Sequence, residues 1–161
     1  AKYQPLRCYE DIMIFSKCGA VASAKPPMRY FPQGIIPVNL KVTTKPINYL
    51  GDKKSDEKVS YTQEEANFPR NVIQFARETD LYHPTQKPIV LMEYIVSTYS
   101  KRGDLVLDFT SGSGSTLLAC EVLNRRWIGI ELTDKYCEVI KKRIQKGIQL
   151  KLQFEYDNEN T

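Results

Sequence analysis

The sequence predicts a three-layer α/β fold, and three observations in its second half lead to that prediction. The apolar segment at 105–107 has the composition of a strand that is buried on both faces of a parallel sheet, and residues 127–130 are predicted to form a second strand. A glycine-rich segment and a helical pattern over about 115–124 separate the two segments. One predicted helix precedes the first strand and another follows the second, which is the alternation typical of an α/β sheet covered by helices.

The flanking helices are predicted from their ends and their apolar spacing. Proline favours the first turn of a helix, so the earlier helix is expected to begin at Pro88 and to end near 101–103, Lys-Arg-Gly. Its apolar stripe is Ile89, Met92, Ile95, Val96 and Tyr99. The later helix is expected to have Thr133 as its cap and Asp134 in its first turn. Its end is expected near the basic residues 141–143.

Composition restricts the class of protein. The 161 residues fit one domain of ordinary size, and 42% hydrophobic with 26% charged residues excludes wholesale disorder. No apolar run approaches the ~18 residues of a membrane span, and no signal segment opens the chain, so a cytoplasmic location is expected. The net charge of +4 permits a nucleic-acid partner without requiring one. One histidine and four cysteines without a C-x-x-C pair predict no metal site.

The chain divides into four regions that differ in composition and in expected secondary structure. Residues 1–18 contain a strand-like run at 11–15, and residues 71–148 form the regular α/β part, beginning with a strand at 71–75. Residues 19–70 hold six of the nine prolines and eight Lys/Arg against five Asp/Glu, which predicts an irregular, basic insertion. Residues 149–161 are polar with an acidic end, and a frayed tail is expected there.

The glycine-rich segment is the first candidate binding site. It follows a predicted strand and precedes a helix, where ligands bind in open α/β sheets, and glycine permits a tight turn and close approach of the backbone. Its residues are Asp108, Phe109, Thr110, Ser111, Gly112, Ser113, Gly114, Ser115 and Thr116. Glu131 ends the next strand and can accept hydrogen bonds from both ribose hydroxyls of an adenosine cofactor. The alternative is an ordinary strand-to-helix turn that binds nothing.

Other nucleotides fit the segment less well. A P-loop requires lysine directly after its last glycine, and this chain has Ser115 there, which disfavours ATP and GTP. Leu117 replaces the third glycine of the dinucleotide pattern, which disfavours a nicotinamide dehydrogenase.

A second candidate is the hexapeptide His-Pro-Thr-Gln-Lys-Pro at 83–88. Two prolines enclose three polar side chains directly before a helix N-terminus, where backbone donors favour an anionic group such as a carboxylate. Composition alone favours the other interpretation, an ordinary helix-entry loop with His83 on the surface.

The order of these segments resembles the beta-class amino-methyltransferases of DNA. The resemblance is carried by the hexapeptide, the following apolar helix, the segment 108–116, and Ile128-Gly129-Ile130-Glu131 followed by Tyr136. It is strong over about residues 68–146 and weaker over 5–17, which looks like a late strand of the family's catalytic domain. The family usually has proline where this chain has Phe109.

The resemblance implies a Rossmann-like fold that binds S-adenosylmethionine and methylates an exocyclic amine of adenine or cytosine in double-stranded DNA. Residues 108–116 would lie beneath the methionine and adenosine portions, and Glu131 would hold the ribose. His83, Thr85, Gln86 and Lys87 would help to close the methionine end. Restriction–modification is the setting that such enzymes often serve.

The family's target-recognition region usually occupies the place of residues 19–70. Basic and aromatic side chains there could contact phosphates and bases, although a solvated basic loop is the alternative. The candidates are Lys25, Arg29, Tyr30, Lys41, Lys45, Lys53 and Lys54.

The family's catalytic motif is Asp, Asn or Ser, then two prolines, then an aromatic residue, and this chain does not contain it. The only Pro-Pro pair, Pro26-Pro27, follows Lys25 and precedes Met28, and lysine cannot accept a hydrogen bond from the amine. We therefore expect a C-terminal portion of a methyltransferase, inactive alone, whose partner would be a missing N-terminal part. A non-catalytic DNA-binding or regulatory remnant is the alternative. The target base, the recognised sequence and a homodimer are left open.

Overall fold

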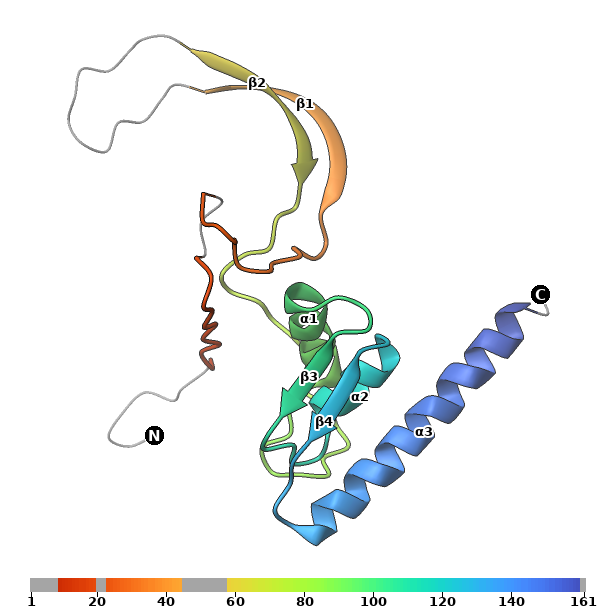
Figure 1. Ribbon diagram of the computed structural model, residues 1–161. Coiled ribbons are helices and arrows are strands. Elements are labelled where there is room, and N and C mark those ends of the chain that lie inside the picture. The colour runs from red at the N-terminus through yellow and green to blue at the C-terminus, as the bar shows by residue number, and fades with distance from the viewer. Residues whose placement is uncertain (1–8, 20–22, 45–57, 160–161) are drawn as a thin grey trace, which may run out of the picture.

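The computed structural model describes residues 9–19, 23–44 and 58–159 (Figure 1). In chain order these residues form β1 (Ile36–Thr44), β2 (Val59–Ala66), α1 (Ile89–Tyr99), β3 (Leu105–Asp108), α2 (Ser115–Val122), β4 (Arg126–Gly129) and α3 (Asp134–Glu159). β1 pairs with β2, and β3 pairs with β4.

The strands β3 and β4 lie parallel, with Leu105 opposite Arg126 and Asp108 opposite Gly129. Parallel neighbours need a crossover, and α2 supplies it, so β3–α2–β4 is a βαβ unit. This unit confirms the predicted α/β class and both predicted strands. The predicted start of the earlier helix is also confirmed, because Pro88 directly precedes α1.

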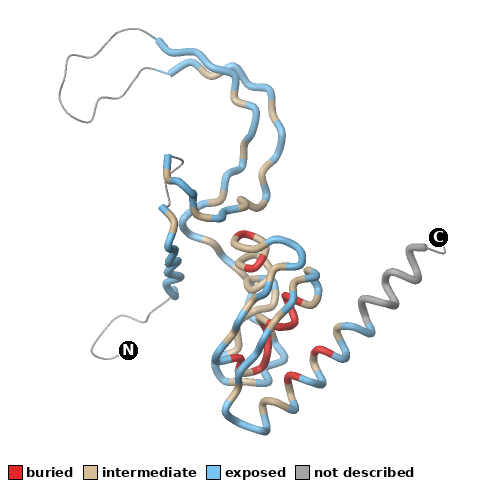
Figure 2. Tube along the Cα trace, in the orientation of Figure 1, coloured by how far each residue is buried: buried red, intermediate tan, exposed pale blue. Residues whose placement is uncertain are grey.

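The core lies around α2, which contacts α1, α3 and both parallel strands. Leu117, Ala119 and Cys120 are almost completely buried. Leu117 packs with Ile140 and Ile144 of α3. Figure 2 shows that the buried positions gather in α2, in α1 and in the first half of α3. The core therefore holds the βαβ unit and α3 together.

The face of the β3–β4 sheet that points away from α2 is exposed in the described part of the chain. Leu105 is 53% exposed, Leu107 57%, Ile128 48% and Ile130 54%. The expectation that 105–107 is buried on both faces is therefore wrong for these residues, because α2 covers only one face. We call these four side chains the open sheet face.

The insertion at 19–70 is not irregular throughout, which corrects the prediction. β1 and β2 form a long antiparallel ribbon that projects from the rest of the molecule (Figure 1), with Lys41 opposite Thr62 and Thr43 opposite Ser60. The register shifts between Pro37 and Leu40, so β1 does not follow a strict alternation of apolar and polar residues, and its strand pattern is weak in the sequence.

Two predicted strands are wrong. Residues 11–15 and 71–75 have strand-like composition but no regular structure. A strand requires a partner for its backbone hydrogen bonds, and neither segment is paired with one. Met13 and Phe15 are 74% and 86% exposed, so nothing described packs on them.

The end of the last helix also corrects the sequence prediction. α3 continues past Arg143 to Glu159, so most of the predicted frayed tail at 149–161 is helical. Gly147 does not end the helix, and a Cβ there would lie 2.5 Å from Leu118 Cδ1, so this glycine permits close packing of α2 on α3. None of the helices in the described ranges has the length and apolar composition needed to cross a membrane.

Candidate cofactor site

The glycine loop, residues 109–114, connects β3 to α2 and is held by hydrogen bonds that centre on Ser111. Ser111 N–H donates to Ile130 O (2.9 Å), its hydroxyl donates to Asp108 O (3.0 Å), and Gly114 N–H donates to Ser111 O (2.7 Å). Gly112 and Gly114 have φ of +53° and +80°, where other residues are strained. The loop therefore lies at the carboxyl ends of both parallel strands, as predicted.

The members of 108–116 differ in exposure. Ser111, Ser113 and Ser115 are buried, whereas Phe109 is 72% exposed. Thr110 N–H donates to Asp108 Oδ1 (3.1 Å), so the strand-end carboxylate supports the turn. Thr116 lies in the first turn of α2 and its hydroxyl faces Met92 Sδ at 3.8 Å. The exposed members of the segment are therefore Phe109 and Thr110, whereas its three serines are enclosed by the fold.

Glu131 follows β4 and closes the loop from the opposite side. Its Oε2 accepts Gly112 N–H (2.8 Å), and its Oε1 accepts Thr133 N–H (3.0 Å). These backbone donors, Thr133 foremost and Gly112 next, hold the pKa of Glu131 below its ordinary value. The carboxylate is therefore ionised at neutral pH, beside the glycine loop.

His83 is the member of the hexapeptide that reaches the glycine loop. Its ring lies 3.7 Å from the position of a Cβ on Gly112, and its centroid is 4.4 Å from that of Tyr136 in α3. Thr85 faces His83 Nδ1 through its N–H (3.2 Å) and its hydroxyl (3.1 Å). His83, Thr85 and Tyr136 thus form one wall beside the loop. The sequence pattern by itself indicates no role for Tyr136.

Gln86 and Lys87 point elsewhere. The Gln86 amide donates to Glu78 Oε2 and to Asp80 O (3.1 Å), and its oxygen accepts Tyr82 N–H (3.0 Å). Lys87 forms an ion pair with Glu10 (2.5 Å). Gln86 therefore organises its own loop, and Lys87 connects that loop to the N-terminal segment.

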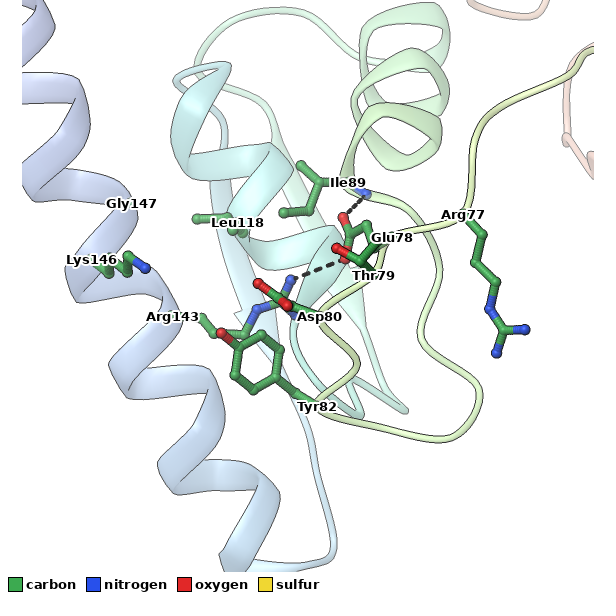
Figure 3. A pocket seen from close by; sticks show the side chains of 10 residues that line it. All are labelled: Arg77, Glu78, Thr79, Asp80, Tyr82, Ile89, Leu118, Arg143, Lys146 and Gly147. Atoms are coloured by element: carbon green, nitrogen blue, oxygen red, sulfur yellow. Dashed lines mark hydrogen bonds and ion pairs between the residues drawn. The ribbon is translucent and has the colours of Figure 1, made fainter.

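A hollow of about 420 Å³ lies between the segment 77–82 and α3 (Figure 3). Its central side chain is Arg143, only 9% of whose side chain is exposed. Burial lowers the pKa of its guanidinium, while the charges of Glu78 and Tyr82 raise it. Sequence reasoning placed Arg143 at a helix end and missed this environment, because nothing in the local pattern indicates burial.

Four of the candidate DNA-contacting residues lie in the part of the chain that the structure describes. Lys41 is exposed on β1, and Lys25 is exposed near the start of the segment 23–35. Arg29 is paired with Asp104 (3.0 Å), and the Tyr30 ring lies 6.0 Å from that of Tyr99, so both lie against the α/β body. Lys45, Lys53 and Lys54 fall outside the described residues.

Comparison with known proteins identifies the relationship. Residues 2–142 match the DNA methylase family of N6 and N4 methyltransferases. The chain belongs to this family. The predicted relationship to DNA amino-methyltransferases is therefore confirmed, and the glycine loop, Glu131 and the hexapeptide all lie within the matched residues.

The curated relatives match this chain over a restricted region. Type II methyltransferase M2.LlaDCHI of Lactococcus lactis subsp. cremoris is 42% identical over 65 residues, covering 40% of this chain and 24% of the relative. Type II methyltransferase M.HpaI of Haemophilus parainfluenzae is 45% identical over 62 residues, covering 38% and 20%. The matched region spans about a quarter of the length of these relatives.

Two solved structures are similar in part. The cytosine-N4-specific PvuII DNA methyltransferase superposes with a TM-score of 0.44 at 26% identity, over 47% of this chain and 31% of that one. M1.HpyAVI in its SAM complex gives a TM-score of 0.41 at 27% identity, over 72% and 63%.

Proposed function

We propose that this DNA methylase chain is the cofactor-binding and DNA-recognition part of an enzyme that methylates the exocyclic amino group of adenine or cytosine in DNA. The proposed methyl donor is S-adenosylmethionine. Membership of the DNA methylase family supports the reaction class. The observation that carries the proposal for this chain is the glycine loop at the carboxyl ends of β3 and β4, with an ionised carboxylate at its edge.

The residues around the loop fit an adenosine cofactor. A carboxylate has about four lone-pair sites, so Glu131 can accept ribose hydroxyls while it keeps its bonds from Gly112 and Thr133. The N-terminus of α2 presents backbone donors that favour a carboxylate such as that of a methionine portion. His83 and Tyr136 supply ring surface beside the loop. When bound, the cofactor supplies an electrophilic methyl group, and these residues orient and enclose it.

DNA recognition is proposed for the β1–β2 ribbon. A two-stranded β-ribbon fits the major groove, and this one is exposed and projects from the body (Figure 1). The register puts Lys41 and Thr62 on the same face as Thr43 and Ser60, whose hydroxyls lie 2.9 Å apart. Ammonium and hydroxyl groups contact phosphates and bases, so we assign this polar face to DNA.

Methyl transfer is proposed to require a further part of the enzyme. The open sheet face leaves four large apolar side chains exposed, where α/β proteins cover both faces. The chain also contains no Asp, Asn or Ser before a Pro-Pro-aromatic sequence that could accept hydrogen bonds from the target amine. We propose that the complementing polypeptide covers this face and supplies that motif.

Calorimetric titration with S-adenosylhomocysteine tests the cofactor site. Glu131→Ala should weaken binding by more than about tenfold, or about 1.4 kcal/mol. Glu138→Ala is the matched control, because Glu138 is an exposed carboxylate of α3 that forms an ion pair with Lys141 on the same helix. Equal binding by the wild-type chain and Glu131→Ala would contradict the assignment of Glu131.

Binding to a fluorescently labelled duplex tests the ribbon. Lys41→Glu should weaken binding about threefold or more and flatten its salt dependence, since phosphate contacts release counterions. Lys141→Glu makes the same charge change on the exposed side of α3 and should alter binding less. The non-catalytic alternative, favoured by the absence of the Pro-Pro-aromatic motif, predicts DNA binding with no activity when the complementing polypeptide is added.

A further inference from the structure

Arg143 links α3 to the glycine loop. One of its guanidinium nitrogens, Nη1, donates to Ser113 O (2.7 Å) and to Ser115 Oγ (3.4 Å). Ser113 and Ser115 are 3% and 5% exposed, so the guanidinium forms its hydrogen bonds with a part of the loop that is shielded from solvent. Ser113 directly precedes Gly114, which is the N-cap of α2. Arg143 thus supports the turn at the point where the loop becomes a helix.

Glu78 links the same cation to the hexapeptide. Glu78 Oε2 lies 3.8 Å from Arg143 Nη2, and the same oxygen accepts the Gln86 amide. The other oxygen, Oε1, accepts Ile89 N–H at 2.7 Å. Since Pro88 provides no side-chain cap for α1, Glu78 caps this helix from a distance of eleven residues.

The two residues therefore form a continuous connection between segments that are far apart in the sequence. Figure 3 shows the carboxylate of Glu78 between the start of α1 at Ile89 and the guanidinium of Arg143. From Arg143 the connection continues to Ser113 and Ser115 of the glycine loop. The Arg143 guanidinium also lies over the Tyr82 ring, 5.0 Å from its centroid, which fixes the segment before His83.

A planar guanidinium can serve these partners together, whereas an ammonium group cannot. Nη1 faces the loop, Nη2 faces the carboxylate, and the plane of the group faces a ring. Neither residue reaches the surface beside Gly112 where the cofactor is proposed to bind: Gly112 instead faces His83 and Glu131. A role in binding would therefore be exerted through the two loops.

We propose that Glu78 and Arg143 are positioning residues that hold the hexapeptide and the glycine loop in the arrangement that binds the cofactor. The inference rests on the proposed function, because it assigns these residues to the same site. It requires that loss of either residue separates the two loops locally, while the helical core around Leu117 stays folded.

The test compares Arg143→Met, Arg143→Lys and Glu78→Gln with the wild-type chain and with Lys141→Met. Lys141 is an exposed cation on the same helix, so its variant matches the charge change without touching either loop. Binding of S-adenosylhomocysteine is measured by calorimetry below the melting temperature of the least stable variant. Backbone amide exchange of the ligand-free proteins is measured in parallel.

We expect Arg143→Met to weaken binding at least about tenfold, equivalent to about 1.4 kcal/mol. Arg143→Lys should restore part of the affinity, Glu78→Gln should give a smaller loss than Arg143→Met, and Lys141→Met should bind as the wild type does. Amide exchange should rise in residues 83–88 and 111–116 and not in the centre of α2. Partial rescue by lysine, together with this local pattern, is the result that a general loss of stability would not produce.

Three outcomes would overturn the inference. Wild-type affinity in Arg143→Met would do so while leaving the proposed function intact, and so would an equal rise of exchange throughout α1, α2 and β3. If the wild-type chain bound no S-adenosylhomocysteine, the proposed cofactor site would be wrong. The positioning role would then be judged by amide exchange alone, and unchanged exchange of residues 83–88 and 111–116 in the variants would overturn it. If Arg143→Met did not fold, Arg143→Lys and Glu78→Gln would decide by the same two measurements.

Discussion

Gly129 is the position where the smallest change should disturb both the core and the glycine loop. A Cβ built on Gly129 would lie 2.3 Å from Leu117 Cδ1 and 2.8 Å from Ser111 Oγ. Leu117 is 1% exposed, so its side chain has little room to move, and Ser111 is fixed by bonds to Asp108 and Ile130. The Gly129→Ala methyl group therefore has to displace β4, α2 or the loop.

The magnitude follows from two opposing effects. Overpacking of a core costs about 1–3 kcal/mol, whereas replacing glycine by alanine stabilises by about 0.4–1 kcal/mol through the unfolded chain. The net loss for Gly129→Ala should be about 1–2 kcal/mol in the free energy of unfolding. With a urea dependence of about 1.5 kcal/mol per M, the unfolding midpoint should fall by about 1 M.

A second substitution separates steric crowding from other effects. Leu117→Ala alone should cost about 2–5 kcal/mol because it leaves a cavity. In the double variant the new methyl group occupies part of that cavity, so the combined loss should be smaller than the sum by at least about 0.5 kcal/mol. Strict additivity, or a Gly129→Ala variant as stable as the wild type in urea unfolding, would refute the packing described for β4 on α2.

Three further predictions follow from charge and burial. Because backbone donors lower the pKa of Glu131 from the ordinary 4.5, its contribution to stability is present above that pH and is lost as the pH falls through the folded value. The stability difference between wild type and Glu131→Gln should therefore be larger at pH 7 than at pH 3 in urea unfolding, and a pH-independent difference would contradict this. Burial raises the pKa of Cys120 to about 11, so iodoacetamide at pH 8 should modify Cys137 before Cys120, as followed by peptide mass spectrometry; equal rates would show that Cys120 is accessible. The ion pair of Lys87 with Glu10 is exposed, so Lys87→Met should change the free energy of unfolding by less than about 1 kcal/mol, and a larger loss would mean that the N-terminal segment is held more firmly than this contact implies.

The sequence determined the central part of the fold because its signals there are local. The apolar run at 105–107, the glycines at 112 and 114 and Thr133, which directly precedes α3, each indicate a structure through their own backbone and immediate neighbours. The same applies to the position of the glycine loop between strand and helix. Four such segments in one order were sufficient to predict membership of the DNA methylase family, which the match over residues 2–142 confirms.

Which strand-like segments pair with one another was decided by the tertiary structure. Segments 11–15 and 71–75 are strand-like in composition, yet they form no strand because a strand needs a neighbour and composition does not name one. β1 and β2 pair with each other, although the register shift between Pro37 and Leu40 interrupts the alternation that would mark β1 as a strand in the sequence. A polar composition likewise predicted a frayed tail, but α3 continues through Gly147, whose missing side chain lets Leu118 pack closely.

The connections within the candidate site also required the tertiary structure. Sequence alone predicted Glu131, His83 and the glycine loop as neighbours, but it gave Gln86 and Lys87 the same role, and the structure directs them to Glu78 and Glu10. Arg143 has the sequence context of an exposed helix end, and burial between α3 and the segment before His83 converts it into a link between two loops. Burial and the partners of a charge are properties of the packed chain, whereas turn geometry and helix caps are properties of the residues themselves.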